Sequence, residues 1–502
     1  MIDFKKIFAD SEKVNIEVKA AQGGIPNSIW ETYSSFANTF GGTIILGIGE
    51  EKETKKFIPV GVADPNKMVS DVWNTVNNAQ KVNVNILLER HVYTQSYDGK
   101  DYVVIEVPRA NRQDKPVYVG TDMFKGTFRR NHEGDYHCTK AEIKAMLRDQ
   151  ADTTSDALVL ENVSLDVLNG DSIKSYRNRF ELIRQGHTWN SLPNDEFLMK
   201  IGAAKISEID GKVHPTLGGL IFFGNFINIM DELPDFFLDY REKLSTETRW
   251  SDRVCSGDGD WSGNVYDFYF KIIDRLTSDV KKPFAINADL LRDDDTPIHK
   301  SIREALANAL IHADYYGRQG IVIEKEFRKL KLSNPGTFRI SVDDAISGGL
   351  SDARNGRIFN MFSLIKVGER SGMGLCDLYT NWKNSGYEKP VIEEMIEPDR
   401  ITLTLQIEVV ADNRRSKGTD QTNQTTNQTT DRTNQTADQP DEVSVEEEIL
   451  FLIKHNPRIT QVQIADELNI PKSTVKYYVS KLSKAKIIKR EGTVHNGKWI
   501  VL

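Results

Sequence analysis

Hydrophobic and polar positions follow different periods along the chain, and these periods predict which segments are strands and which are helices. Short apolar runs such as 43–49 and 102–108 predict buried strands in the N-terminal part. Residues 29–40 carry apolar side chains at helical spacing, and Gly41 and Gly42 follow them as a C-terminal cap. The N-terminal part is therefore predicted to be a mixed sheet with helices.

The last 60 residues have a more regular pattern. A first helix is predicted over residues 444–456, with an acidic first turn that suits the helix dipole. Thr460 is suited to N-cap a second helix, and a third opens at Lys472. Two strand patterns around a glycine turn end the chain. Three helices followed by two strands predict a winged helix-turn-helix, and the segment resembles that of bacterial transcription regulators.

The distribution of charge supports a DNA-binding role for this segment. The chain carries 65 Lys and Arg against 73 Asp and Glu, a net charge of −8, so no global basic footprint exists. From Ile470 onward, however, eight basic residues face one acidic residue, a local charge of +7. The residues expected to contact bases and phosphates are Lys472, Ser473, Thr474, Lys476 and Tyr477. The alternative is a winged helix that serves protein interaction or dimerisation.

Composition divides the chain into five parts. Residues 411–442 hold almost no apolar side chains, so they are predicted to be a disordered linker before the winged helix at 443–502. Ahead of it, the patterns predict three blocks, 1–150, 151–290 and 291–410. The predicted fold class is α/β (α+β) and multidomain, with a mixed-sheet N-terminal domain.

Other sequence features bear on the compartment. No apolar signal segment follows Met1, and no apolar run reaches the about 20 residues that span a membrane. The three cysteines lie far apart, which excludes a disulfide framework and predicts reduced thiols. We expect a cytoplasmic protein with no membrane partner.

A helix in the third block carries two polar residues on an otherwise apolar surface. Glu304 and Asn308 are four residues apart and so share one face. An asparagine carbonyl can bind Mg²⁺ beside nucleotide phosphates, while a glutamate orients a water molecule for attack. The alternative is a polar stripe paired locally, since this spacing alone is common.

Two glycine-containing turns follow this helix. Asn334, Pro335 and Gly336 end a strand pattern, and glycines at 368, 372 and 374 precede a helix. Glycines just before a helix N-terminus let backbone N–H groups approach phosphates. The phrases REALANALIHADYYGRQG, LSNPG, GGLSDARN and GERSGMG resemble the GHKL superfamily of ATPases, and more closely a divergent branch found in bacterial transcriptional regulators.

This resemblance implies a GHKL-like α/β sandwich that binds ATP with Mg²⁺. It implies that Glu304 is the catalytic base of a weak ATPase, that Asn308 is the Mg²⁺ ligand, and that Gly372 and Gly374 form the phosphate turn. Asn334 stands where the superfamily has an aspartate that binds adenine, and Gly336 completes that turn. Residues 347–371 would be the lid. The alternative is a domain that senses nucleotide without hydrolysis, or only dimerises.

The N-terminal block carries a second resemblance. Its segments EVK, FANTFGG, ILGIG and FRRNHEGDYHCTKAEI resemble the Schlafen–AlbA-like DNA-binding domain over residues 10–130. The resemblance implies a nucleic-acid surface, for DNA or alternatively RNA, at the following residues: Lys19, Asn38, Gly41, Gly42, Arg129 and Arg130. The structural alternative is that Asn38 and the glycines only cap the helix and form the turn.

Some Schlafen relatives are nucleases, which gives an alternative function. Glu12, Glu17 and Glu50 could converge on a metal ion, although Lys19 lies beside Glu17. The first hypothesis is an ATP-binding, DNA-binding transcriptional regulator. The alternatives are a nuclease-like defence protein gated by ATP and a scaffold that does not hydrolyse ATP. Block 151–290 receives no chemistry, and its aromatic residues suggest an interdomain surface or a homodimer surface.

Overall fold

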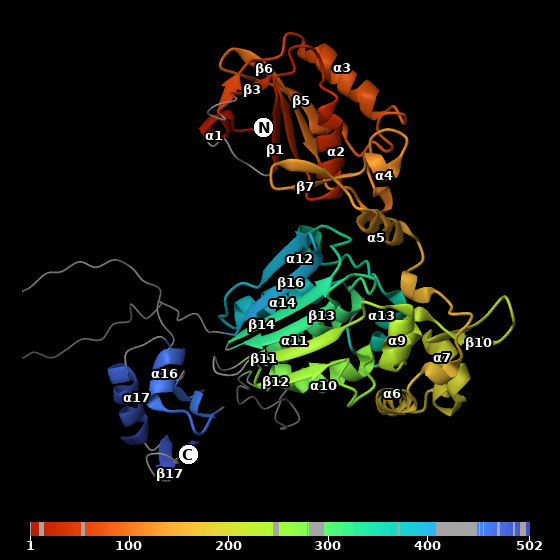
Figure 1. Cartoon of the computed structure of the whole chain (residues 1–502), viewed down its shortest axis with the longest axis vertical. Helices are drawn as coiled ribbons and strands as arrows, with labels where there is room; N and C mark the ends of the chain where they lie inside the picture. Colours follow the sequence, from red (N-terminus) through yellow and green to blue (C-terminus); the bar gives the residue numbers. More distant parts are fainter. Residues whose placement is uncertain are drawn as a thin grey trace, which may run out of the picture. The chain divides into compact units, whose positions relative to one another are not determined.

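The computed structural model describes most of the chain (Figure 1). The described residues are 2–9, 15–51, 56–243, 250–278, 280, 296–326, 328–368, 372–407, 449–450, 452–454, 456–468, 472–484, 487–491 and 498–501. The predicted linker, 411–442, lies outside them. Unit 1 comprises Met1–Leu158 with two short pieces, Phe338–Ser341 and Arg354–Gly356, and unit 2 comprises the remaining residues.

Unit 1 is built on a four-stranded mixed sheet in the order β1-β2-β6-β5. Its strands are β1 (Ile16–Lys19), β2 (Gly42–Leu46), β6 (Lys100–Val107) and β5 (Val92–Tyr97). The pair β1 and β2 is parallel, and the other neighbours are antiparallel. This confirms the mixed sheet that the short apolar runs predict.

Strand β2 is buried on both faces because alternate side chains point to opposite sides of a sheet. Ile44 and Leu46 pack with α2 (Ser28–Asn38) and α3 (Pro65–Val76) in one cluster, which includes Tyr33 and Phe36. Ile45 belongs to a second cluster with Phe4 and Ile7 of α1 (Phe4–Ala9). A continuous apolar run is therefore required here.

Smaller elements complete unit 1. They are the hairpin of β3 (Ile48–Glu50) and β4 (Phe57–Pro59), the hairpin of β7 (Phe128–Asn131) and β8 (Gly134–His137), and helices α4 (Met123–Gly126) and α5 (Lys140–Gln150). Thr139 and Glu142 form a capping box that starts α5, each accepting from the other's backbone N–H group.

Unit 2 contains a six-stranded sheet in the order β12-β11-β13-β14-β16-β15. Its strands are β12 (Asp252–Cys255), β11 (Leu238–Lys243), β13 (Ile321–Glu326), β14 (Lys329–Pro335), β16 (Asp399–Gln406) and β15 (Val391–Ile396). Only β11 and β13 run parallel, and the other pairs are antiparallel.

Helices cover one face of this sheet and the other face is partly exposed, as the alternating burial of β13 shows. The covering helices include α10 (Val265–Thr277), α11 (Pro297–Ile311) and α14 (Gly374–Asn384), and α11 lies along the sheet in Figure 1. The Nε1 group of Trp382 on α14 donates to the Gln406 carbonyl at 2.8 Å. The result is a two-layer α/β sandwich. Two further helices, α12 (Val342–Ser347) and α13 (Gly356–Leu364), lie between β14 and α14 in the chain.

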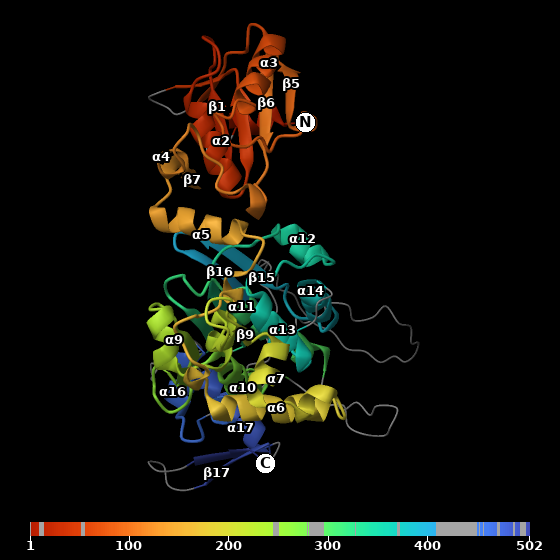
Figure 2. The same ribbon diagram turned by 90° about the vertical axis from the view of Figure 1, so that its right-hand side faces the viewer.

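The segment before the sheet shares its hydrophobic core. It contains α6 (Gly170–Ile183), α7 (Asn194–Ile201), β9 (Ala204–Ile206), β10 (Val213–Pro215), α8 (Leu217–Phe223) and α9 (Phe226–Glu232). Helices α6 and α7 lie side by side in Figures 1 and 2, and the Phe180 and Phe197 rings lie 5.4 Å apart. The Tyr176 hydroxyl donates to the Met361 carbonyl at 2.7 Å. One core therefore runs from this segment through the six-stranded sheet, and the winged helix has a separate core.

The sequence patterns predict a boundary between two blocks at residue 290, but the six-stranded sheet contains strands from both sides of that position. Strands β11 and β12 come from before that position, yet they extend the sheet that β13 to β16 form. Hydrogen bonding between strands distant in sequence gives no signal in the local pattern. Aromatic residues of block 151–290 suggested a dimer surface, but several of them, such as Tyr266 and Phe268, are buried in the core. They therefore give no support to a dimer surface.

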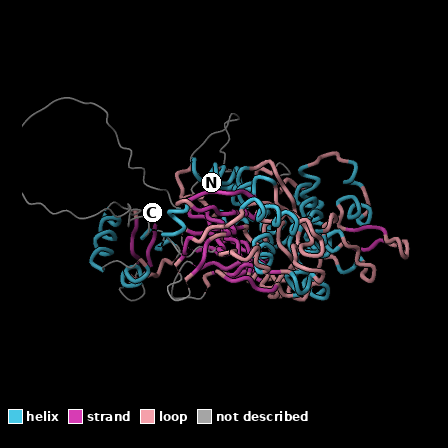
Figure 3. The backbone as a smooth tube through the Cα atoms, turned by 90° about the horizontal axis from the view of Figure 1, so that it is seen from above, coloured by secondary structure: helices cyan, strands magenta, loops and turns pink. Residues whose placement is uncertain are grey.

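The C-terminal segment has the predicted elements. Helical residues at 449–450 and 452–454 precede α16 (Gln461–Glu467), α17 (Lys472–Lys484), β17 (Ile488–Glu491) and β18 (Lys498–Val501). Thr460 caps α16 as predicted, accepting from the Gln463 N–H group at 3.2 Å. Trp499 on β18 donates to the Ile459 carbonyl at 3.0 Å, which ties the wing to the helices. Figure 3 shows the two strands beside the helices near the label C.

The described residues contain no helix that is long and apolar enough to cross a membrane.

The sheets and helices of the described residues show the predicted fold class, a mixed α/β multidomain chain that ends in a winged helix.

Candidate nucleotide site and nucleic-acid surfaces

Helix α11 positions the two polar residues of the predicted nucleotide site. Thr296 accepts from the His299 N–H group as the N-cap, and Pro297 occupies the first turn, where its missing N–H group costs nothing. Ile302, Leu306 and other apolar residues bury one side of the helix. Glu304 and Asn308 are half-buried one turn apart, so they share a face as predicted.

Gly374 lies directly against this face. A β-carbon placed on Gly374 would lie 2.6 Å from Glu304 Oε1 and 3.1 Å from Asn308 Nδ2. Gly374 is the first residue of α14, and the preceding Met373 makes no side-chain cap. The structure thus brings together Glu304, Asn308 and Gly374, three of the residues that the sequence predicts.

The rest of the glycine segment lies near the same end of α11. A β-carbon on Gly368, whose φ is +73°, would lie 3.6 Å from Ile311 Cδ1. Gly372 has φ +69° and accepts a hydrogen bond from the Gly349 N–H group at 3.2 Å. The predicted lid therefore contacts the phosphate turn, while residues 369–371 lie outside the described residues.

The turn at Asn334 is held close to the end of α11. Asn334 and Pro335 end β14, and the Asp314 N–H group, three residues beyond α11, donates to the Pro335 carbonyl at 2.9 Å. Gly336 has φ +100°, which favours glycine. Asn334 is buried, and its amide donates to the Pro335 carbonyl at 3.2 Å.

These residues have the chemistry that a nucleotide phosphate with Mg²⁺ requires. The first N–H groups of α14 have no side-chain cap, and the positive end of the helix dipole favours an anion. The amide of Asn308 has no hydrogen-bond partner among the described residues, so its carbonyl remains available to a cation. A side chain at position 374 would clash with both groups, so glycine lets the N-terminus of α14 approach Glu304 and Asn308 closely. The residues therefore fit the predicted ligand.

A cavity of about 670 Å³ in unit 2 is a separate feature. Its lining includes Phe236, Arg241, Ser333 and Arg400, and none of the predicted nucleotide residues. Arg400 donates to the Gly320 and Ser333 carbonyls, and Arg241 pairs with Asp239 at 2.6 Å. Because none of the predicted nucleotide residues lines this cavity, it does not replace α11 as the candidate site.

Unit 1 contains an ion-pair cluster around Asp149, a residue that the sequence analysis missed. Asp149 Oδ2 lies 2.6 Å from an Arg354 nitrogen, and Oδ1 lies 3.9 Å from Arg339 Nε. Burial alone would raise the pKa of Asp149, but the two arginines hold it below its usual value. Arg354 falls within the predicted lid, so this part of the lid belongs to unit 1. The sequence gives no signal for these ion pairs, because Asp149 and its arginine partners are about two hundred residues apart.

Asn38 lies in the interior of unit 1. Its Nδ2 group donates to the Val117 and Phe128 carbonyls at 2.8 and 2.9 Å, and its Oδ1 accepts from the Val117 N–H group at 2.9 Å. The residue is 5% exposed. These contacts join the end of α2 to two other segments of the chain, which accounts for an asparagine here without a ligand.

Arg130 and Arg129 are also buried and paired. Arg130 lies 3.2 Å from Glu17 and 2.9 Å from Asp135, and Arg129 lies 3.0 Å from Glu142. Thr32 and Ser35 of α2 donate to the carboxylate of Asp135. Lys19 is half-buried and lies 2.7 Å from Glu17. The cluster thus joins β1, α2, β7 and β8, and contact of these residues with nucleic acid stays a prediction.

Gly41 and Gly42 are required by close packing. A β-carbon on Gly41, whose φ is +76°, would lie 2.8 Å from the Val107 carbonyl oxygen, and one on Gly42 would lie 2.6 Å from the Phe36 ring. The turn therefore needs both glycines whether or not a ligand binds.

The carboxylates of the nuclease alternative do not form a described cluster. Glu12 lies outside the described residues, and Glu50 is exposed at the end of β3. Glu17 pairs with two cations, Lys19 and Arg130. A carboxylate already neutralised in this way is poorly suited to hold a metal ion.

The recognition helix α17 carries the predicted DNA contacts of the winged helix. Lys476 is exposed on it, as a phosphate contact requires. The side chains of Lys472, Ser473, Thr474 and Tyr477 lie outside the described residues. Their contacts with DNA stay predictions.

Four family models match successive parts of the chain. Residues 1–139 match Schlafen, AlbA_2, and residues 144–239 match a domain of unknown function, DUF8451. Residues 321–405 match a family described as "Putative ATP-dependent DNA helicase recG C-terminal", and residues 445–489 match the winged helix-turn-helix DNA-binding family. The third match includes Asn334 and the glycine turn but begins after Glu304 and Asn308.

Two solved structures are similar to this chain. The DIP2311 protein from Corynebacterium diphtheriae is 17% identical, with 99% of this chain and 83% of that chain covered and a TM-score of 0.38. The "N-terminal Domain of Putative ATP-dependent DNA Helicase RecG-related Protein" from Nitrosomonas europaea is 30% identical over 27% of this chain and 90% of that chain, with a TM-score of 0.22. Among curated proteins, none matches.

The family matches agree with the sequence analysis at both ends of the chain and in the six-stranded sheet. They support nucleic-acid binding by the N-terminal and C-terminal domains. The chain therefore combines a Schlafen AlbA_2 domain, an ATPase-like domain and a C-terminal winged helix-turn-helix.

Proposed function

We propose that this protein is a DNA-binding transcriptional regulator whose affinity for DNA depends on ATP bound in a GHKL-like domain. The observation that carries the proposal is the packing of Gly374 against Glu304 and Asn308, with a β-carbon position 2.6 Å from Glu304 Oε1. A helix N-terminus, an unpartnered amide and a carboxylate meet there.

The residues have distinct roles in this proposal. Asn308 holds Mg²⁺ through its side-chain carbonyl, and the N–H groups that follow Gly372 and Gly374 hold phosphate oxygens. Asn334 and Gly336 form the adenine end of the site. When ATP is bound, it supplies a phosphoryl group that water can attack. Glu304 orients that water and accepts its proton at a carboxylate oxygen, which gives a weak ATPase.

DNA is held at the two ends of the chain. At the C-terminal end, the proposed contacts are Lys472, Ser473, Thr474, Lys476 and Tyr477 on α17. In unit 1, the proposed surface lies around Lys19, Arg129 and Arg130, with Asn38, Gly41 and Gly42 holding the backbone in place. RNA is the alternative ligand of unit 1.

The lid offers a route for coupling between nucleotide and DNA. Arg354 is part of the predicted lid, and its ion pair with Asp149 places it in unit 1 together with the Schlafen AlbA_2 domain. A nucleotide that moves residues 347–371 would therefore change the contacts of Arg354. Our proposal is that this change of contacts alters the affinity for DNA, which would couple the two sites.

Calorimetric titration of the full-length chain with ATP and Mg²⁺ tests the proposal. We expect saturable binding by the wild type and affinity at least about tenfold weaker in Asn308→Ala, a difference of about 1.4 kcal/mol. Asn384→Ala is the matched control, because Asn384 is exposed at the far end of α14. The same proteins are then titrated with DNA in the presence and absence of ATP.

Each outcome has a separate meaning. The nucleotide part fails if the wild type does not bind ATP, or if Asn308→Ala binds it as well as Asn384→Ala does. If ATP binds but leaves DNA affinity unchanged, the coupling is wrong and the chain is a nucleotide-binding scaffold. Glu304→Gln is expected to keep ATP binding and to reduce hydrolysis about 100-fold or more.

A further inference from the structure

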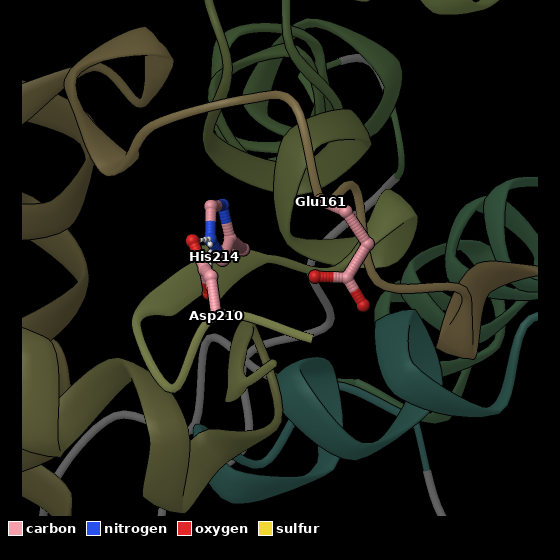
Figure 4. A group of neighbouring side chains, drawn as sticks. All are labelled: Glu161, Asp210 and His214. Carbon is pink, nitrogen blue, oxygen red and sulfur yellow. Dashed lines mark hydrogen bonds and ion pairs between the residues drawn. The ribbon is translucent and has the colours of Figure 1, made fainter. Parts of the chain in front are cut away.

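A histidine and two carboxylates meet in unit 2, in the segment that matches a domain of unknown function. Glu161 lies near the start of the unit, two residues after Val159, which bridges to Thr216. Asp210 lies in the turn between β9 and β10, and His214 lies on β10. One ligand atom from each residue lies within 4.8 Å of the other two. Figure 4 shows an oxygen of Glu161 directed toward the other two side chains.

The acceptor groups on both sides of the His214 ring favour a positive charge at this position. The side chain is buried, and its Nδ1 lies 2.8 Å from the Val163 carbonyl oxygen. Its Nε2 lies 3.0 Å from Asp210 Oδ2. A carbonyl and a carboxylate can only accept hydrogen bonds, whereas a neutral imidazole has a single N–H group. With that group on Val163, the Nε2 lone pair faces the Asp210 carboxylate, and the two repel unless a cation or a proton lies between them.

Glu161 adds an independent observation. Its Oε2 atom is shielded from solvent and has no hydrogen-bond partner among the described residues. A buried carboxylate oxygen without a partner is costly, because it has lost water and gained nothing in exchange. The two carboxylates also place two negative charges around one imidazole. A divalent cation would satisfy Glu161 and His214 at once.

We propose that Glu161, Asp210 and His214 bind a divalent transition-metal ion of the Zn²⁺ class. One imidazole and two carboxylates form a ligand set of borderline hardness, which suits Zn²⁺ better than Ca²⁺, whose ligands are oxygens. Contacts around the ligands support this role. Val163 fixes the ring through Nδ1, and the Lys212 N–H group donates to Asp210 Oδ1 at 2.9 Å. Metal ligands are commonly oriented by such contacts.

The bound ion would join two parts of unit 2. Glu161 belongs to the chain entering the unit, and the other ligands belong to the β9–β10 hairpin. The Leu160 N–H group already donates to the Pro215 carbonyl at 3.0 Å, so the ion would reinforce an existing contact. The site is therefore structural, and it is independent of the proposed nucleotide function.

Zn²⁺ titration of the chelator-treated full-length chain, followed by calorimetry, tests this inference. We expect the wild type to bind Zn²⁺, and His214→Gln and Asp210→Asn each to weaken that binding at least about tenfold, because even changes to residues behind the ligands cost about 10- to 100-fold. Glu208→Gln is the matched control. It removes the same charge from the same hairpin turn, where the Glu208 side chain is 92% exposed.

A second measurement tests the inference with a different variant, in case His214→Gln or Asp210→Asn folds poorly. Co²⁺ is substituted for Zn²⁺, and the visible absorption of the wild type is compared with that of Glu161→Gln, which changes only the unpartnered carboxylate. We expect the absorption band of the bound ion to weaken in Glu161→Gln and to remain in Glu208→Gln. The inference is overturned if the wild type shows no saturable binding, as a shared proton would predict, or if the three ligand variants bind as Glu208→Gln does.

Discussion

Asn38 in unit 1 and Asn308 in unit 2 are both asparagines near the end of a helix, and the sequence singles out both. Asn38 ends α2, is 5% exposed, and uses both ends of its amide on Val117 and Phe128. Asn308 lies in the last turn of α11, is half-buried, and has no side-chain partner among the described residues. The first amide holds the protein together, while the second is available to a ligand.

The glycines near the two asparagines show the same difference. Gly42 follows Asn38 closely and leaves room for the Phe36 ring, an internal packing contact. Gly374 packs directly against Glu304 and Asn308, two polar side chains. A glycine packed on an apolar ring indicates a structural role, and one that faces polar groups at a helix N-terminus indicates a ligand. Asn38→Ala and Gly374→Ala test this distinction, and Asp149→Asn tests a second structural contact of unit 1.

The largest effect is expected for Asn38→Ala. The change removes the side-chain partner of the Val117 N–H group and of the Phe128 carbonyl, each at about 1–3 kcal/mol, so we expect a loss of about 2–5 kcal/mol in local stability. The Val117 carbonyl still accepts from Ser34 Oγ at 2.7 Å. Hydrogen exchange of the α2 amides measures the loss. Asn27→Ala is the control, because Asn27 precedes α2 without making a side-chain cap. If exchange in both variants equals that of the wild type, the structural role of Asn38 is wrong.

A smaller effect is expected for Asp149→Asn, with a characteristic pH dependence. Loss of the charged contacts with Arg354 should cost about 1–3 kcal/mol near pH 7. Because the pKa of Asp149 is lowered in the folded protein, its contribution is present above the unfolded value of 3.8 and is lost as the pH falls through the folded value. Unfolding curves of wild type and variant should therefore converge only below about pH 4. Convergence near pH 6 would contradict this account.

The smallest effect on stability, and a specific effect on binding, is expected for Gly374→Ala. The added methyl group takes the space beside Glu304 Oε1, so ATP affinity should fall at least about tenfold, or about 1.4 kcal/mol. Gly170→Ala is the control, because Gly170 also starts a helix and a β-carbon there meets no atom within 4 Å. Equal ATP affinities in the two variants would place the nucleotide elsewhere.

Local patterns predict much of this molecule. The capping of α16 by Thr460, the two-sided burial of β2 and the common face of Glu304 and Asn308 all follow from spacing within a few residues. Each depends on helix or strand periodicity, which the sequence displays directly.

Contacts between distant segments were not predictable in the same way. The pairing of β11 with β13, the ion pair between Asp149 and Arg354, and the meeting of Glu161 with His214 depend on how the chain returns to itself. Arg129 and Arg130 illustrate the limit in another way. Adjacent arginines suggest a phosphate surface, but both are buried, and the half-buried carboxylates that pair with them come from other elements, Glu142, Glu17 and Asp135.

The six-stranded sheet has a practical consequence for anyone who divides this protein into pieces. A fragment that begins near residue 290 keeps β13 but loses β11, its parallel neighbour. It would expose a full row of backbone donors and acceptors, and it would lose many residues of the core to which Ile321 and Ile323 belong. An open edge of this kind recruits strands from other molecules. The ATPase-like region is therefore expected to aggregate when expressed alone and to remain soluble when expressed from residue 159 onward.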